Sequence, residues 1–87
     1  MSAAADKALA EAIRAMEAAK PRSGIRPETE QEWRRVIAAV EQLAYAMQLM
    51  AGQSPEKARA YAHIAHSGVA GRILLEMAFD ADEARHG

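Results

Sequence analysis

The stretch Ala51-Gly52-Gln53-Ser54-Pro55-Glu56 divides the chain into helical segments. Glycine after the last apolar residue of a helix is a common stop, because it adopts the positive φ that ends many helices. Ser54 then offers a capping hydroxyl, and Pro55 suits the first helical position. A short turn of this kind joins antiparallel helices. The stretch therefore predicts two long antiparallel helices that meet at residues 51–55.

The segment before this turn, residues 28–51, is predicted to be an amphipathic helix. Pro27 suits its first position, and the run Thr29 to Glu32 has the pattern of a capping box. Its apolar residues form two rows at helical spacing, a face wide enough to touch more than one neighbour. The first row is Trp33, Ile37, Val40, Ala44, Met47 and Ala51, and the second is Val36, Leu43 and Met50.

The segment after the turn, residues 55–84, is predicted to be one continuous helix that can bend, and the alternative is a break into two shorter helices at Ser67 and Gly68. Glycines 68 and 71 interrupt it, but each costs only about 1 kcal/mol relative to alanine. We expect them to pack closely against the alanines of the preceding helix. Two apolar rows mark two faces, with Arg72 and Glu76 spaced to pair between them. One row is Tyr61, Ile64, Leu75 and Phe79, and the other is Val69, Ile73 and Met77.

The N-terminal segment, residues 3–20, is predicted to be a shorter helix with Leu9, Ile13 and Met16 along one face. Residues 21–27 hold two prolines and a glycine and are predicted to be a linker. The sequence as a whole, residues 1–87, therefore predicts a single all-α domain. We expect a three-helix bundle of two long antiparallel helices and a shorter N-terminal helix.

The composition predicts self-association. Hydrophobic residues make up 51% of the 87 positions, but 22 residues are alanine, so each contributes little apolar area to a core. Small domains usually compensate with disulfides, a metal or association, and the chain has no cysteine. We therefore expect a homodimer or a larger symmetric assembly.

The charge and the motifs exclude several function classes. A net charge of −1 gives no basic field for nucleic acid, which is an unlikely partner. No apolar run approaches the roughly 20 residues of a membrane span, so we expect a soluble, cytoplasmic protein and no membrane partner. No arrangement typical of a catalytic site occurs. The sequence predicts no enzymatic activity and no cofactor.

The leading hypothesis is therefore stoichiometric binding to a larger protein, as an adaptor or inhibitor. The side chains expected to take part in partner binding are Trp33, Tyr45, Leu49 and Tyr61, since large apolar or aromatic side chains dominate such contacts. In size and lack of catalytic residues the chain is similar to the inhibitors, antitoxins and immunity proteins of phages and mobile elements. That resemblance is one of class and has no motif behind it.

Two alternative hypotheses concern small ligands. Arg22, Arg26, Arg34 and Arg35 cluster near the linker, where an oligomer could bind an anion such as a nucleotide. His63 and His66 lie three residues apart on a helix and could both bind a transition metal if other ligands converged on them. Without a ligand, the arginines would form surface ion pairs, and the histidines would be partly buried or interfacial side chains.

Overall fold

The described residues of the computed structural model form four helices, and the all-α prediction is confirmed. The structure describes residues 3–24, 26–66 and 68–86, the side chains of Val69 and His86 excepted. The helices are α1 (Ala3–Ala18), α2 (Glu30–Met50), α3 (Pro55–His66) and α4 (Gly68–His86). Within the described residues there is no strand.

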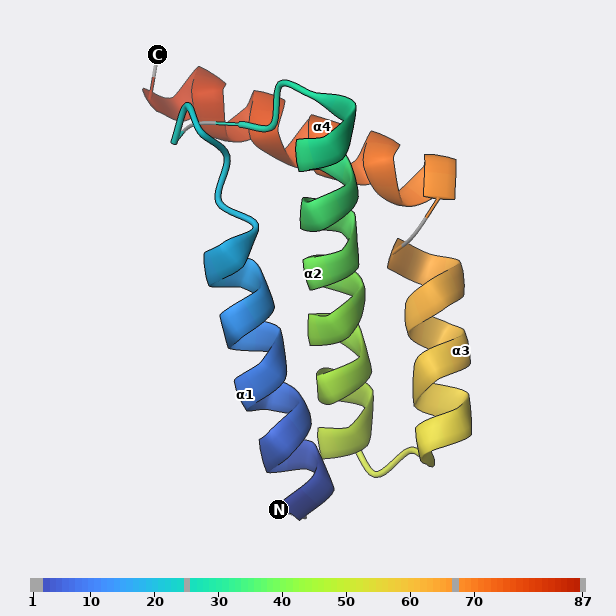
Figure 1. Cartoon of the computed structure of the whole chain (residues 1–87). Helices are drawn as coiled ribbons and strands as arrows, with labels where there is room; N and C mark the ends of the chain where they lie inside the picture. Colours follow the sequence, from blue (N-terminus) through green and yellow to red (C-terminus); the bar gives the residue numbers. More distant parts are fainter. Residues whose placement is uncertain (1–2, 25, 67, 87) are drawn as a thin grey trace.

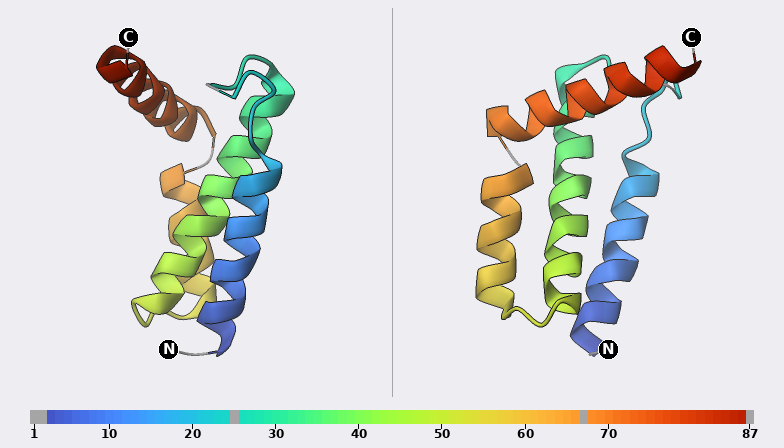
Figure 2. Two further views of the ribbon diagram at one scale, coloured as in Figure 1. Left: turned by 90° about the vertical axis from the view of Figure 1, so that its left-hand side faces the viewer. Right: turned by 180° about the vertical axis from the view of Figure 1, so that it is seen from behind.

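The first three helices lie side by side in one layer, with α2 in the middle (Figure 1). Helices α1 and α3 both pack on α2, and no Cα atoms of the two come within 8 Å of each other. Helix α4 runs across one end of this layer, on one side of it only (Figure 2). The arrangement is therefore an open layer with a crossing helix, and α1, α2 and α3 do not close around a common core.

The start of α2 confirms the capping box. The Thr29 side chain accepts a hydrogen bond from the Glu32 N–H at 3.1 Å, and helix α2 begins at Glu30. The prediction that Pro27 is the first helical residue is wrong, because the cap lies two residues later. The Glu32 carboxylate also accepts the N–H of Arg22 at 2.8 Å, which ties the linker to α2 and lowers the pKa of Glu32 below its usual value.

The turn between α2 and α3 has the predicted chemistry. Gly52 adopts φ 94°, in the left-handed region that favours glycine. Ser54 Oγ accepts the N–H of Lys57 at 3.3 Å and caps α3. These two local features place α2 and α3 antiparallel and in contact.

The predicted continuous helix over residues 55–84 is wrong, because α3 ends at His66 and α4, which begins at Gly68, runs in a different direction. Gly68 has φ 70°, and Ser67 lies outside the described residues. A Cβ on Gly71 would lie 2.6 Å from the carbonyl carbon of His66. Gly71 therefore packs against the backbone at the end of α3 and not, as predicted, against the alanines of α2.

The interior consists almost entirely of alanine. Of the ten hydrophobic residues that are buried within the described part of the chain, nine are alanines and the tenth is Trp33. Helix α1 buries Ala5, Ala8 and Ala12 instead of its larger side chains, because alanine allows two helix axes to approach closely. Ile13 and Met16 remain 52% and 45% exposed. The expectation of a thin core is therefore confirmed.

The chain exposes more accessible surface than is expected for a folded monomer of its mass. Its accessible surface is 6077 Å², whereas a folded monomer of 9.4 kDa is expected to expose about 5,000 Å². The radius of gyration is 13.6 Å, compared with about 12 Å for a domain of this length. The excess of about 1,000 Å² follows from the open layer.

Candidate interaction surface

Helix α4 is held to the N-terminal half of α2 by an aromatic contact. The rings of Trp33 and Phe79 meet edge to face with centroids 5.9 Å apart. The Arg72 guanidinium lies 5.1 Å from the Trp33 ring centroid, in a cation–π arrangement. As a result Trp33 is only 4% exposed.

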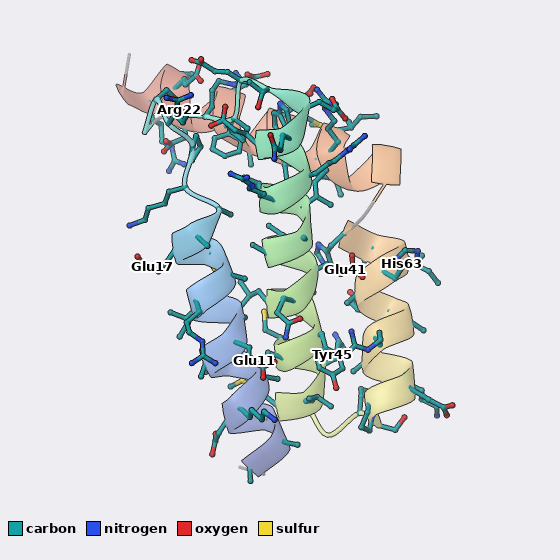
Figure 3. All side chains as sticks on the ribbon, in the orientation of Figure 1. Glu11, Glu17, Arg22, Glu41, Tyr45 and His63 are labelled. Atoms are coloured by element: carbon teal, nitrogen blue, oxygen red, sulfur yellow. The ribbon has the colours of Figure 1, made fainter. Side chains whose placement is uncertain are left out.

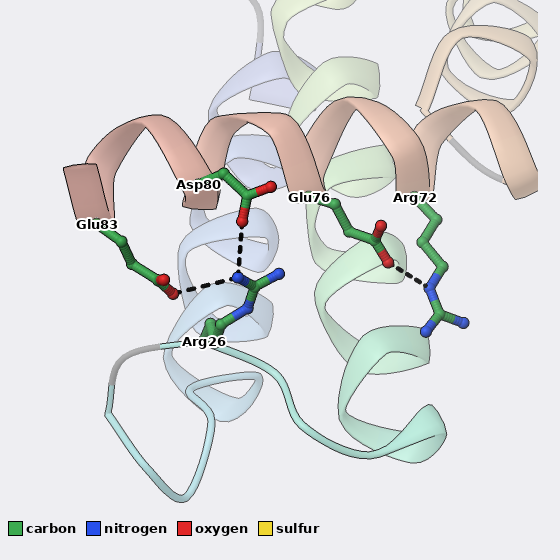
Figure 4. Close-up of polar contacts among 5 residues, drawn as sticks. All are labelled: Arg26, Arg72, Glu76, Asp80 and Glu83. Atoms are coloured by element: carbon green, nitrogen blue, oxygen red, sulfur yellow. Dashed lines mark hydrogen bonds and ion pairs between the residues drawn. The ribbon is translucent and has the colours of Figure 1, made fainter.

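Ion pairs flank this aromatic contact (Figure 4). Arg26, in the linker, donates to Asp80 at 2.8 Å and to Glu83 at 3.3 Å. The hydrogen bond to Asp80 raises the pKa of Arg26. These side chains are partly exposed, so the pairs orient α4 more than they stabilise it.

Arg72 makes a second set of ion pairs on α4. It donates to Glu30 of α2 at 2.6 Å and to Glu76 at 3.1 Å, and the pair with Glu76 is the one that the spacing predicted. The hydrogen bond to Glu30 raises the pKa of Arg72. One guanidinium therefore links α4 to the start of α2.

The side of the layer that α4 crosses is apolar and only half covered. The first apolar row of α2 begins at Trp33, beneath α4, and continues to Met47, which is 58% exposed. Val40, Ala44, Met47 and Tyr61 line a hollow of about 180 Å³ on this side. We call this side the open face. The exposed large side chains of α1, α2 and α3 are Ile13, Met16, Met47, Met50, Tyr61 and Ile64.

Helical geometry shows which side chains of α1 point toward the open face. Ala18 lines a groove of about 590 Å³ together with Ala38 and Gln42 of α2. Ala38 and Gln42 are each two residues from Val40 and so lie on the opposite side of α2 from the open face. Met16 is two residues from Ala18 and therefore points toward the open face.

A second apolar surface lies on α4 itself. Met77 is two residues from both Leu75 and Phe79, so it points away from the side of α4 that contacts α2. The exposed side chains here are Ile73, Leu74 and Met77, at 52%, 57% and 62%. We call these three residues the α4 ridge. Helix α4 is thus apolar on two opposite sides, and only one of them is covered by its own chain.

The contacts between α2 and α3 outside the open face are polar. The Arg59 guanidinium lies 4.2 Å from the Tyr45 ring centroid, and His63 Nδ1 lies 3.4 Å from Glu41 Oε1 (Figure 3). Tyr45 and Leu49 are partly buried. This side therefore offers less free apolar surface than the open face.

The structure separates the four predicted partner-binding residues. Trp33 is covered by α4, Tyr45 lies against Arg59, and Leu49 is partly buried. Tyr61, 53% exposed, lies on the open face. The predicted partner-binding residues do not include the α4 ridge. The two apolar rows of residues 55–84 are the signal that could have revealed it, because two such rows are typical of a helix with two partners.

The four predicted anion-binding arginines have different surroundings. Arg26 is paired with Asp80 and Glu83. Arg34 lines a hollow of about 430 Å³ that also contains Glu30, Glu41 and Arg72, whereas Arg35 lines the groove beside α1. The backbone N–H of Arg22 is bound by Glu32.

The two histidines of the metal hypothesis have different surroundings. His63 lies beside Glu41, whereas the ring of His66 lies 6.4 Å from that of Tyr61 at the open face. Among the residues that the structure describes, no group of three or more His, Cys, Asp or Glu side chains could hold a metal ion. None of the helices over the described ranges is long and apolar enough to cross a membrane.

Comparison with protein-family models, curated proteins and solved structures gives no match to this chain.

Proposed function

We propose that this chain is a non-enzymatic interaction module that acts by stoichiometric binding, and that the open face is its contact surface for another protein. The partner surface required is apolar, because the open face presents aliphatic, methionine and tyrosine side chains. Stoichiometric binding is the part of the expected adaptor or inhibitor role that this surface supports.

The excess surface is the observation that carries the proposal. Specific protein interfaces bury about 800 Å² on each partner. The chain exposes about 1,000 Å² more than a folded monomer of its mass. Nine large apolar side chains are among the exposed residues, on the open face and the α4 ridge. Large apolar side chains that are exposed together on one surface mark interaction sites.

Photo-cross-linking in the native host tests this function. A photoreactive phenylalanine analogue at Met47 is expected to give discrete covalent adducts, whose masses identify the partners. The same analogue at Arg14 is the control, because Arg14 is exposed and two residues from buried Ala12, so it points away from α2. Absence of any adduct at Met47, with the protein folded, would refute the proposal.

A further inference from the structure

We infer that the open face binds a second copy of this chain, and that the α4 ridge of each copy lies on the open face of the other. This inference rests on the proposed function, because it names the protein that the open face binds.

The half-covered row of α2 is the first support. Helix α4 of the same chain covers the Trp33 end of this row and leaves Met47 and Met50 exposed. The missing cover is therefore a second helix that lies across the layer. With 19 residues, α4 is about 28 Å long. This length matches the shorter dimensions of the molecule, 25 and 23 Å, so the α4 of another copy can lie across the open face.

The two sides of α4 are the second support. One side docks on its own α2 through Phe79, and the opposite side presents Met77 and Ile73. A helix with two apolar sides fits between two layers. In a two-fold dimer each contact occurs twice, so both α4 helices would lie between the two layers.

Area and charge favour a second copy over an unrelated protein. The large exposed side chains of the ridge and of the open face are aliphatic, methionine or tyrosine, and homodimer interfaces are more apolar than transient ones. The surface excess of about 1,000 Å² is close to what each partner in a dimer buries. A net charge of −1 means that two copies repel each other only weakly.

Complementation between two charged variants tests the arrangement. Sedimentation equilibrium of the full chain is expected to give twice 9.4 kDa. Met77→Lys, on the ridge, and Met47→Glu, on the open face, should each weaken self-association by about 100-fold or more. An equimolar mixture should recover the dimer, because the heterodimer has one unaltered ridge-to-face contact and one that pairs Lys with Glu. Arg14→Glu is the control and should remain dimeric.

A second pair of variants tests the same arrangement without introducing charged side chains, which can unfold the protein. The natural sequence has no cysteine, so Met47→Cys and Met77→Cys give single thiols. A short bismaleimide should join the two variants when they are mixed, and should join either variant to itself much less.

Three outcomes would overturn the inference. The first is a wild-type chain that stays monomeric at several hundred micromolar. The second is a charged pair that stays monomeric when mixed, although circular dichroism shows both variants folded. The third is equal cross-linking in mixed and unmixed cysteine variants. A monomer whose Met47 position still cross-links to a larger protein would overturn this inference and leave the proposed function standing, whereas a monomer with no adduct would overturn both.

Discussion

The docking of α4 can be measured directly, because Trp33 is the single tryptophan of the chain and lies under Phe79. We predict that Phe79→Ala undocks α4 and exposes the Trp33 ring. Partial burial of a phenylalanine contributes about 1 to 2 kcal/mol, and the edge-to-face pair adds about 1 kcal/mol. The loss of about 2 to 3 kcal/mol should favour the undocked state by about 30- to 140-fold.

Tryptophan fluorescence is the assay. Phe79→Ala should shift the emission of Trp33 to longer wavelength and increase its quenching by acrylamide, while far-ultraviolet circular dichroism stays helical. Met77→Ala is the matched control on the same helix, because Met77 points away from α2 and Trp33 stays covered even if the dimer dissociates. Unchanged emission and quenching in a folded Phe79→Ala variant would refute the view that this contact holds α4 in place.

Three further predictions concern stability. Gly71→Ala should lower the melting temperature although alanine is the better helix former, because its Cβ would collide with the His66 backbone. Ala12→Leu should cost about 1 to 3 kcal/mol by overpacking the fully buried contact with α2, measured by urea unfolding. Glu32→Gln should reduce the loss of folding stability in acid, because the pKa of Glu32 is lowered in the folded state. The Glu32 carboxylate contributes to stability above the usual glutamate pKa of about 4.3. This contribution is lost as the pH falls through the lower pKa of the folded state.

Two of these predictions have a control in the same chain. Ala10→Leu makes the same substitution at an exposed position of α1 and should cost little. Glu56→Gln removes the same charge from the first turn of α3. A Gly71→Ala variant that melts higher than the wild type would show that α3 and α4 do not approach closely. Parallel pH profiles for Glu32→Gln and the wild type would contradict the role given to Glu32.

The sequence by itself determined the features that depend on neighbouring residues. Thr29 and Glu32 cap α2, Gly52 and Ser54 form the turn, and Arg72 pairs with Glu76. These interactions join residues within one or two turns of helix, where spacing fixes distance. The helical class and the thin core followed equally from composition, because 22 alanines favour helices and bury little area.

The tertiary structure alone decided which surfaces are buried. Leu9, Ile13 and Met16 form the larger apolar row of α1, yet its alanines pack on α2, because close approach of the backbones outweighs the area of longer side chains when only one neighbour is present. Arg26 and Asp80 are 54 residues apart and pair only because α4 turns back across α2. That turn depends on Gly68, which adopts a positive φ, and on Gly71, which lets α4 approach the backbone at the end of α3. Burial and long-range pairing depend on the relative placement of whole helices, which no local spacing encodes.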